Sequence, residues 1–387
     1  MLKVKLITIG RFHHFHLARQ LYKLKLLDEI YSGYPKFKLK DEYEIPKNKI
    51  KTYPYYQLLY LFFNKYSKYT SSSILDYLSA VSHRTLSIKT SKNIGDANIL
   101  IASSNSGLEA GKRIKTLNGK FICDRGSSHI KFQNEILKNE YNELKIPYNE
   151  ISKETIYREQ EEYNEADIIS VPSTFAFNSF LKKGIDKKKL FLNPYGVDLQ
   201  RFYPLQKIKT ENFQVLYVGA LSVGKGIFYL LEAFKKLKFK NKKLMLIGSI
   251  EDQIKTKITK YLSNQIEYLP VIKNNQLIKY YSKANVLVQP SIEEGLSLVI
   301  AEALACGCPV IATKNTGAND LFKDGQEGFI IDARSVEQIN DKLQLLADNK
   351  VLQEEMSHNA KINVSLIGGW DQYGKNWHDK LKDIYDD

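Results

Sequence analysis

The chain has few of the residues that mark secreted, metal-binding or membrane-spanning proteins. Its 387 residues include three cysteines, Cys123, Cys306 and Cys308, an odd number without regular spacing, which argues against a disulfide framework. Cys306 and Cys308 lack a second pair of ligands at zinc-site spacing, so we do not expect zinc there. The most apolar run, residues 58–63, is far shorter than the ~20 residues that cross a bilayer. We therefore expect buried thiols, a cytoplasmic location and no transmembrane helix.

The formal charge of +14 leaves several partners open. Nucleic acid, an anionic membrane and an anionic substrate would each attract such a chain. A chain rich in Lys, Asn, Ile and Tyr is also what an AT-biased genome gives, so the charge alone decides nothing. The lysines are spread along the sequence without a concentrated basic patch, which argues against a purely nucleic-acid-binding protein.

Hydrophobic patterning predicts an α/β protein built from two similar halves. Short buried strands alternate with helices, first from residue 3 and again from residue 214, as in parallel sheets. The spacing of Leu17, Leu21, Leu24 and Leu27 predicts the first helix. Two Rossmann-like domains facing across a cleft are the expected architecture. The expected boundaries are 1–205 for the N-terminal domain, 206–365 for the C-terminal domain and 366–387 for a C-terminal helix, with a hinge at 206–212.

The C-terminal residues form a clear helical stripe. Trp370, Tyr373, Trp377, Leu381 and Ile384 recur every three or four positions. Such a stripe indicates either a membrane-surface helix or a helix that docks on the body of the protein, and we favour docking.

Two glutamates are the candidate binding residues in the second half of the chain. A strand ending near Pro290 is followed by a helix expected to open near Gly295 and to end at Gly307, with Glu294 just before it and Glu302 inside it. First-turn amides bind phosphate or sugar oxygens, and a carboxylate accepts two hydrogen bonds from a ribose diol. The alternative is a dipole-favoured glutamate beside a solvated one.

Several motifs in the same order resemble the retaining glycosyltransferases of family four, which have the GT-B fold. Besides Glu-x7-Glu, they are Ala166–Ser173, Asn193-Pro-Tyr-Gly-Val-Asp198 with Phe202 and Pro204, Gly219-x5-Lys225-Gly226, and Gly317-Ala-Asn-Asp320 with Gly325 and Gly328. The resemblance is specific over residues 155–335 and only general before them.

The resemblance implies roles for individual residues. Glu302 would bind the ribose, Glu294 the donor sugar, and the amides of Gly295, Leu296 and Ser297 the sugar and diphosphate, while Lys225 would neutralise the diphosphate. The family usually has an arginine where this chain has Ala220; Arg125 or Arg11 is a candidate replacement.

In the N-terminal half the assignments follow the same resemblance. Gly10 corresponds to the glycine loop near the diphosphate. Asp124 or His129 is a candidate for the residue that meets the reacting centre, and Ser127 for an acceptor or phosphate contact, the alternative for His129 being an ordinary loop histidine. His13, His14 and His16 have no second ligand cluster, so we expect them to cap a helix or line the acceptor cleft and to bind no metal.

The expected function is that of a hexosyltransferase that moves a sugar from a nucleotide-sugar to a hydroxyl with retention, without a cofactor or metal. The acceptor would be a glycan or lipid-linked glycan of a surface polysaccharide, glycolipid or lipopolysaccharide. The basic, aromatic residues 36–69 suggest peripheral attachment to the inner membrane face.

Rival functions remain open to different degrees. Residues 219–226 nearly match the phosphate-binding P-loop motif, but this motif requires a Ser or Thr that binds Mg²⁺ at the position of Gly226. A nicotinamide-binding glycine motif is missing after the first strand. A GT-B nucleotide-sugar epimerase and a non-catalytic nucleotide-sugar-binding protein remain as alternatives.

Overall fold

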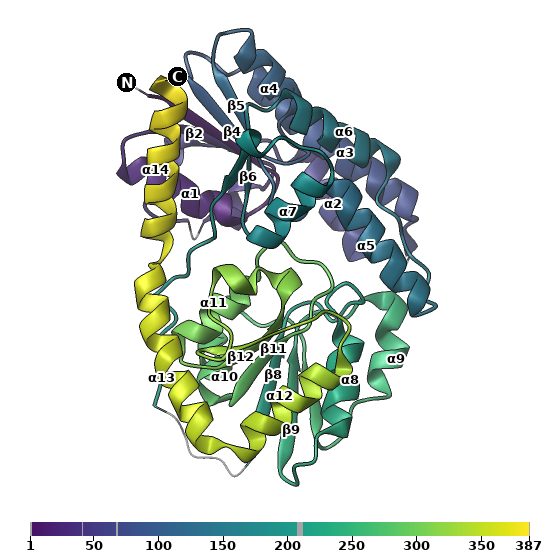
Figure 1. Ribbon diagram of the computed structural model, residues 1–387. Helices are drawn as coiled ribbons and strands as arrows, with labels where there is room; N and C mark the ends of the chain where they lie inside the picture. The colour runs from purple at the N-terminus through teal and green to yellow at the C-terminus, as the bar shows by residue number, and fades with distance from the viewer. Residues whose placement is uncertain (1, 41, 67–68, 207–211, 387) are drawn as a thin grey trace.

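The computed structural model describes residues 2–40, 42–66, 69–206 and 212–386 (Figure 1). Within these residues the chain forms two parallel sheets, each in its own α/β domain. The first sheet has the order β3-β2-β1-β4-β5-β6-β7 and the second the order β10-β9-β8-β11-β12-β13. Both orders reverse direction beside the first strand of the domain, between β1 and β4 and between β8 and β11. Loops that diverge at such a point leave a crevice at the carboxyl ends of the strands.

The N-terminal domain contains the longer sheet. Its strands are β1 (Val4–Thr8), β2 (Leu27–Ser32), β3 (Ile50–Thr52), β4 (Ile99–Ser103), β5 (Lys120–Asp124), β6 (Ile168–Val171) and β7 (Leu190–Leu192). Its helices are α1 (His13–Lys23), α2 (Tyr55–Lys65), α3 (Ser72–Ser91), α4 (Leu108–Lys115), α5 (Ile130–Glu143), α6 (Lys153–Glu165) and α7 (Thr174–Lys182).

The C-terminal domain repeats the plan. Its strands are β8 (Phe213–Val218), β9 (Lys242–Ile247), β10 (Ile266–Leu269), β11 (Val286–Gln289), β12 (Val310–Thr313) and β13 (Gly328–Ile331). Its helices are α8 (Ile227–Lys236), α9 (Lys255–Thr259), α10 (Ile278–Lys283), α11 (Leu298–Ala305), α12 (Val336–Asp348) and α13 (Lys350–Ile367). The final helix, α14 (Trp370–Asp386), crosses back to the N-terminal domain and lies beside α1 (Figure 1).

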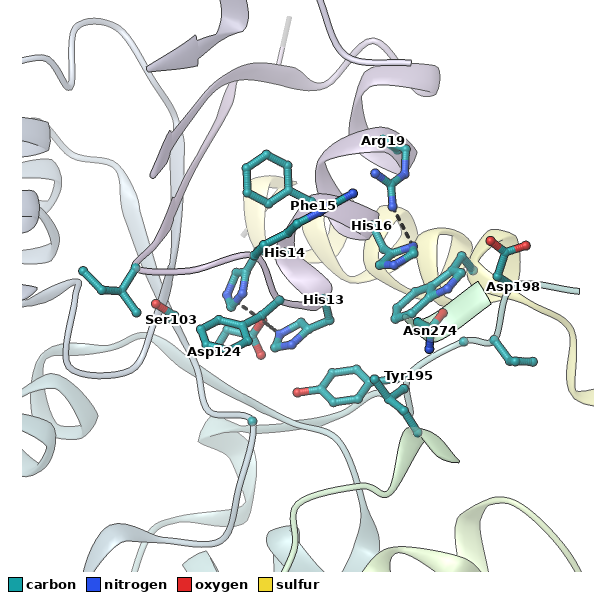
Figure 2. A pocket seen from close by; sticks show the side chains of 18 of the residues that line it. His13, His14, Phe15, His16, Arg19, Ser103, Asp124, Tyr195, Asp198 and Asn274 are labelled. Atoms are coloured by element: carbon teal, nitrogen blue, oxygen red, sulfur yellow. Dashed lines mark hydrogen bonds and ion pairs between the residues drawn. The ribbon is translucent and has the colours of Figure 1, made fainter. Parts of the chain in front are cut away.

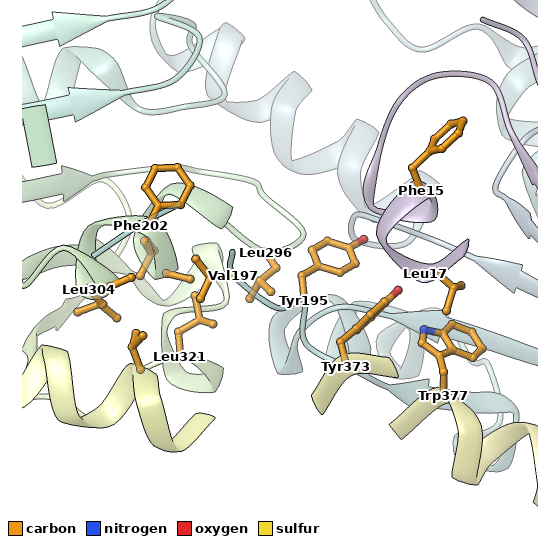
Figure 3. Close-up of a cluster of buried hydrophobic side chains, with 14 of the residues drawn as sticks. Phe15, Leu17, Tyr195, Val197, Phe202, Leu296, Leu304, Leu321, Tyr373 and Trp377 are labelled. Atoms are coloured by element: carbon orange, nitrogen blue, oxygen red, sulfur yellow. The ribbon is translucent and has the colours of Figure 1, made fainter. Parts of the chain in front are cut away.

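The C-terminal stripe docks on the protein, as predicted. Tyr373 and Trp377 are buried, and Gln20 of α1 donates a 2.9 Å hydrogen bond to Asp371. The segment between β7 and the C-terminal domain, residues 193–206, is called the linker below. One apolar cluster runs from Leu17 through Tyr373 and the linker to Leu304 and Leu321 of the C-terminal domain (Figure 3). The two domains therefore share buried apolar surface along the linker and the helices α13 and α14, which stabilises their relative position.

The first helix is shorter than the sequence pattern predicts. It ends at Lys23, and Lys25 has a left-handed φ of 61°, which a helix cannot contain. Leu27 is the first residue of β2 and not part of the helix stripe. Most of the hinge expected at 206–212 lies outside the described residues, and the expected domain boundaries remain predictions.

Candidate active site

A cleft of about 840 Å³ opens between the two domains, at the carboxyl ends of both sheets (Figure 2). The N-terminal domain contributes the loop after β1, with Arg11 and His13, and the end of β5 at Asp124. The C-terminal domain contributes Leu298 and Glu302 of α11. The cleft therefore brings together groups from both halves of the chain.

Glu302 lies in this cleft with a partly satisfied carboxylate. Asn274 donates a 2.9 Å hydrogen bond to Oε1, and the Tyr281 hydroxyl donates a 2.8 Å hydrogen bond to Oε2. Burial raises the pKa of Glu302 to about 6, although these two bonds oppose the rise. Each carboxylate oxygen accepts more than one hydrogen bond, so Glu302 retains capacity for the two hydroxyls of a diol.

The start of α11 differs in detail from the prediction. The helix begins at Leu298, with Ser297 at its N-cap, so Glu302 lies about one turn inside it. The Ser297 amide donates to the carbonyl of Thr316 at 3.0 Å and is not a free first-turn donor, which corrects the expectation for this residue. The helix ends as expected, with Gly307 in the left-handed conformation at φ 70°.

Lys225 and Glu294 form an ion pair, with Nζ and Oε1 3.0 Å apart, and Ser291 donates a further bond to Glu294 at 2.9 Å. Neither residue lines the 840 Å³ cleft. The next residue, Gly226, has φ 66° and packs so closely on Pro290 that a Cβ would lie 2.0 Å from its carbonyl oxygen. A serine or threonine therefore cannot replace Gly226 without moving the backbone, and this loop is not a magnesium-binding P-loop.

The cations of the cleft come from the N-terminal domain and the linker. Ala220 is exposed and brings no charge. Both candidate replacements line the cleft, but Arg11 is paired with Glu42, and Arg125 is buried and bonded to Glu159 at 3.0 Å. Arg201, which the sequence did not suggest, also lines the cleft and donates a 3.0 Å bond to Asn274, the residue that bonds Glu302.

Asp124 lies in the cleft with two histidines from the start of α1 (Figure 2). Its Oδ2 is 2.8 Å from Nε2 of His13 and 3.2 Å from Nε2 of His14. Burial would raise the pKa of Asp124, but the charge and hydrogen bond of His13 outweigh it and hold that pKa below its usual value. One ligand atom from each residue lies within 4.8 Å of the others, a spacing that a metal ion can occupy. The sequence does not indicate a third metal ligand beside His13 and His14, whereas the fold brings Asp124 next to them.

The sequence of residues 203–363 matches the family model described as glycosyl transferases group 1. The C-terminal domain is a group 1 glycosyltransferase domain. A stretch of 162 residues is 35% identical to the capsular polysaccharide biosynthesis glycosyltransferase CapM of Staphylococcus aureus, covering 41% of this chain and 43% of that protein. A D-inositol 3-phosphate glycosyltransferase of Paenarthrobacter aurescens is 26% identical over 202 residues, which are 48% of this chain and 50% of that protein. The chain thus spans half or less of the length of these relatives.

The whole chain, including the domain before the group 1 domain, resembles solved structures. HepE of Anabaena, in complex with UDP and glucose, superposes with a TM-score of 0.71 at 14% identity, over 99% of this chain and 100% of that one. This similarity establishes the architecture expected from the sequence, the GT-B fold with two Rossmann-like domains facing across a cleft.

Two candidates in the N-terminal domain do not line the cleft. His129 is buried against Tyr163 and Phe180, and its Nδ1 accepts a 3.2 Å hydrogen bond from the Lys131 amide at the start of α5. Gly10 lies between two lining residues, where a Cβ would meet the Phe12 ring at 2.8 Å. The structure therefore brings Asp124, and not His129, to the group 1 domain across the cleft.

Glu293 is a residue of the interdomain site that the sequence does not identify. This carboxylate precedes Glu294 and is buried between the group 1 domain and the N-terminal domain. Ser127 lines the cleft, and its hydroxyl donates a 2.6 Å hydrogen bond to Oε1 of Glu293. The only sequence signal was the first acid in Glu293-Glu294-Gly295, which by itself fits a solvated loop residue equally well.

Proposed function

We propose that the protein is a retaining glycosyltransferase that moves a sugar from a nucleotide-sugar to a hydroxyl acceptor. The observation that carries this proposal is the position of Glu302, which faces an interdomain cleft from a group 1 glycosyltransferase domain. HepE, a protein of the same fold, has been crystallised with UDP and glucose, which supports a nucleoside diphosphate as the leaving group.

The donor would bind mainly to the C-terminal domain. Glu302 would accept hydrogen bonds from the ribose hydroxyls, and the start of α11 together with Lys225 would face the diphosphate. The ion pair between Lys225 and Glu294 places a cation beside the carboxylate that would hold the sugar hydroxyls. Stabilising the departing diphosphate lowers the barrier to its loss.

In the proposed reaction the bond between the sugar C1 and the diphosphate oxygen breaks, and a bond forms between C1 and the acceptor oxygen on the same face. The acceptor proton passes to the leaving diphosphate, so the step balances without another reactant. We propose that Lys225 and the helix dipole stabilise the leaving charge without a metal ion. Asp124, with His13, would contact the acceptor side of the cleft.

We further propose that the acceptor is a glycan carried at a membrane surface, as in the synthesis of a surface polysaccharide, glycolipid or lipopolysaccharide. No helix among the described residues is long and apolar enough to cross a bilayer. Helix α2, however, buries only Gln57 and exposes aromatic residues such as Tyr55 and Phe62. Residues 45–75 contain no Asp or Glu and five lysines, a composition that suits an anionic lipid surface.

The deciding experiment is a panel of nucleotide-sugars, screened first by thermal shift and then for turnover with lipid-linked and glycan acceptors. A matching donor should raise the melting temperature by ligand linkage, and transfer should give a product with the donor's anomeric configuration. Isomerisation of the sugar without an acceptor would favour the epimerase alternative, and stabilisation without any turnover would favour a binding protein.

A further inference from the structure

Glu293 is a buried carboxylate whose hydrogen bonds come from the opposite domain. It lies in the loop between β11 and α11 and is 6% exposed. Its Oε1 accepts from Ser127 Oγ at 2.6 Å, from Ser128 Oγ at 2.7 Å and from the Ser128 amide at 3.3 Å. Its Oε2 accepts from Gln133 Nε2 at 2.9 Å.

These bonds depend on the distance between the domains. Removing a charged carboxylate from water is costly unless several donors replace the water. The N-terminal domain supplies the four donors described above. Burial alone would raise the pKa of Glu293, but the hydrogen bonds from these donors outweigh burial and hold the pKa below its usual value. If the domains separate, Glu293 regains water and the donors lose their acceptor. The bonds therefore require the close approach of the two domains and stabilise this closed arrangement.

The loop that carries Glu293 also carries the proposed donor site. Glu294, which pairs with Lys225, is the next residue. Gly295 follows and packs against the N-terminal domain so closely that a Cβ would lie 1.9 Å from the carbonyl oxygen of Gly126. The Ile292 amide donates at 2.9 Å to the carbonyl of Gly224, which adjoins Lys225. A shift of Glu293 would thus move the donor loop relative to the loop that follows Asp124.

We propose that Glu293 is a positioning residue that fixes the position of one domain relative to the other. By accepting bonds from Ser127, Ser128 and Gln133, it aligns the donor loop at Glu294 with the N-terminal groups at Asp124 when the cleft closes. This inference rests on the proposed transferase function, because it assigns closure to the step in which donor and acceptor meet.

The test compares Glu293→Gln with Glu140→Gln. Glu140 is a matched control because it is fully buried and bonded across the domain interface, by Tyr229 at 2.7 Å and Arg334 at 2.6 Å, outside the cleft lining. We expect Glu293→Gln to lower kcat about tenfold or more, the loss expected when a hydrogen bond to a charged group is weakened. Affinity for the donor nucleotide should change less than about threefold, because the donor binds mainly to one domain. Glu140→Gln should leave kcat within about threefold of the wild type.

A second measurement separates this inference from the transferase proposal. Hydrogen exchange of the free protein should be faster at residues 126–128 in Glu293→Gln than in the wild type or Glu140→Gln. Gln133→Ala, which removes one donor, should give the same change in milder form. Faster exchange in a protein that transfers no sugar would leave the positioning role standing and reject the transferase. Unchanged exchange at 126–128, or equal losses of kcat in both glutamate variants, would overturn the role of Glu293.

Discussion

Nε2 of His13 lies 2.8 Å from Oδ2 of Asp124, although 111 positions separate the two residues in the chain. His13 is the first residue of α1, and Asp124 is the last residue of β5. Both lie at the carboxyl edge of the sheet, near the switch in strand order between β1 and β4. The His13 ring also stacks on Tyr195 of the linker, with centroids 4.2 Å apart. Asp124 therefore orients an imidazole at the wall of the cleft.

The histidine–aspartate group allows a direct test of the metal-free proposal. We expect transfer activity to survive dialysis against EDTA, because the proposed mechanism assigns stabilisation of the leaving diphosphate to Lys225, which pairs with Glu294 in the free protein, and to the start of α11. Activity should be assayed before and after chelation, with Mg²⁺, Mn²⁺ and Zn²⁺ added back. Loss of activity on chelation, with recovery on adding one ion, would contradict the proposal and indicate a metal held by His13, His14 and Asp124.

Donor binding should depend on pH through Glu302. Its pKa of about 6 means that the carboxylate gains its charge as pH rises through 6, and the charged form is the better acceptor for ribose hydroxyls. At pH 5 about a tenth of the molecules carry the charge, so donor affinity should be about tenfold weaker than at pH 7.5. Isothermal titration across this range is the measurement. Glu302→Gln should flatten the profile, and an unchanged profile in that variant would remove Glu302 from the donor site.

The sequence predicted the architecture better than the contacts across the cleft. Periodic apolar residues and Pro/Gly punctuation identified most strands, and the spacing of Trp377 with its neighbours predicted the docking of α14. The prediction that Leu27 belongs to the first helix was wrong, because its spacing continues the helix stripe while the left-handed Lys25 breaks the helix before it. Asp124 and Glu293 acquire their partners only when distant loops meet, and no local pattern encodes such a meeting.

His129 should affect stability more than chemistry. Burial lowers its pKa to about 4, so the unfolded chain, with an ordinary histidine pKa of 6.5, binds a proton first as pH falls. The stability that this group contributes is complete above pH 6.5 and falls toward pH 4, with about 2 kcal/mol lost at pH 5. Urea unfolding at pH 7 and 5 should show a smaller acid loss in His129→Asn than in the wild type. A large loss of kcat in His129→Asn, with stability unchanged, would restore a catalytic role.

Helix α2 should bind anionic lipid. We expect the protein to float with vesicles of phosphatidylcholine and phosphatidylglycerol but only weakly with phosphatidylcholine alone, since both exposed aromatics and lysines contribute. Phe62→Ser should reduce flotation. Tyr385→Ser is the matched control, because Tyr385 is 48% exposed on α14 and Phe62 is 58% exposed on α2. Equal flotation with both vesicle types, or equal effects of both variants, would contradict membrane docking through α2.

The role of Glu302 as the ribose acceptor is tested most directly by a crystal structure with the nucleoside diphosphate of the donor found in the panel. We expect the ribose hydroxyls to lie within hydrogen-bond distance of the Glu302 carboxylate, with the diphosphate directed toward Lys225 and the start of α11. A nucleotide bound elsewhere, with Glu302 still bonded only to Asn274 and Tyr281, would contradict it.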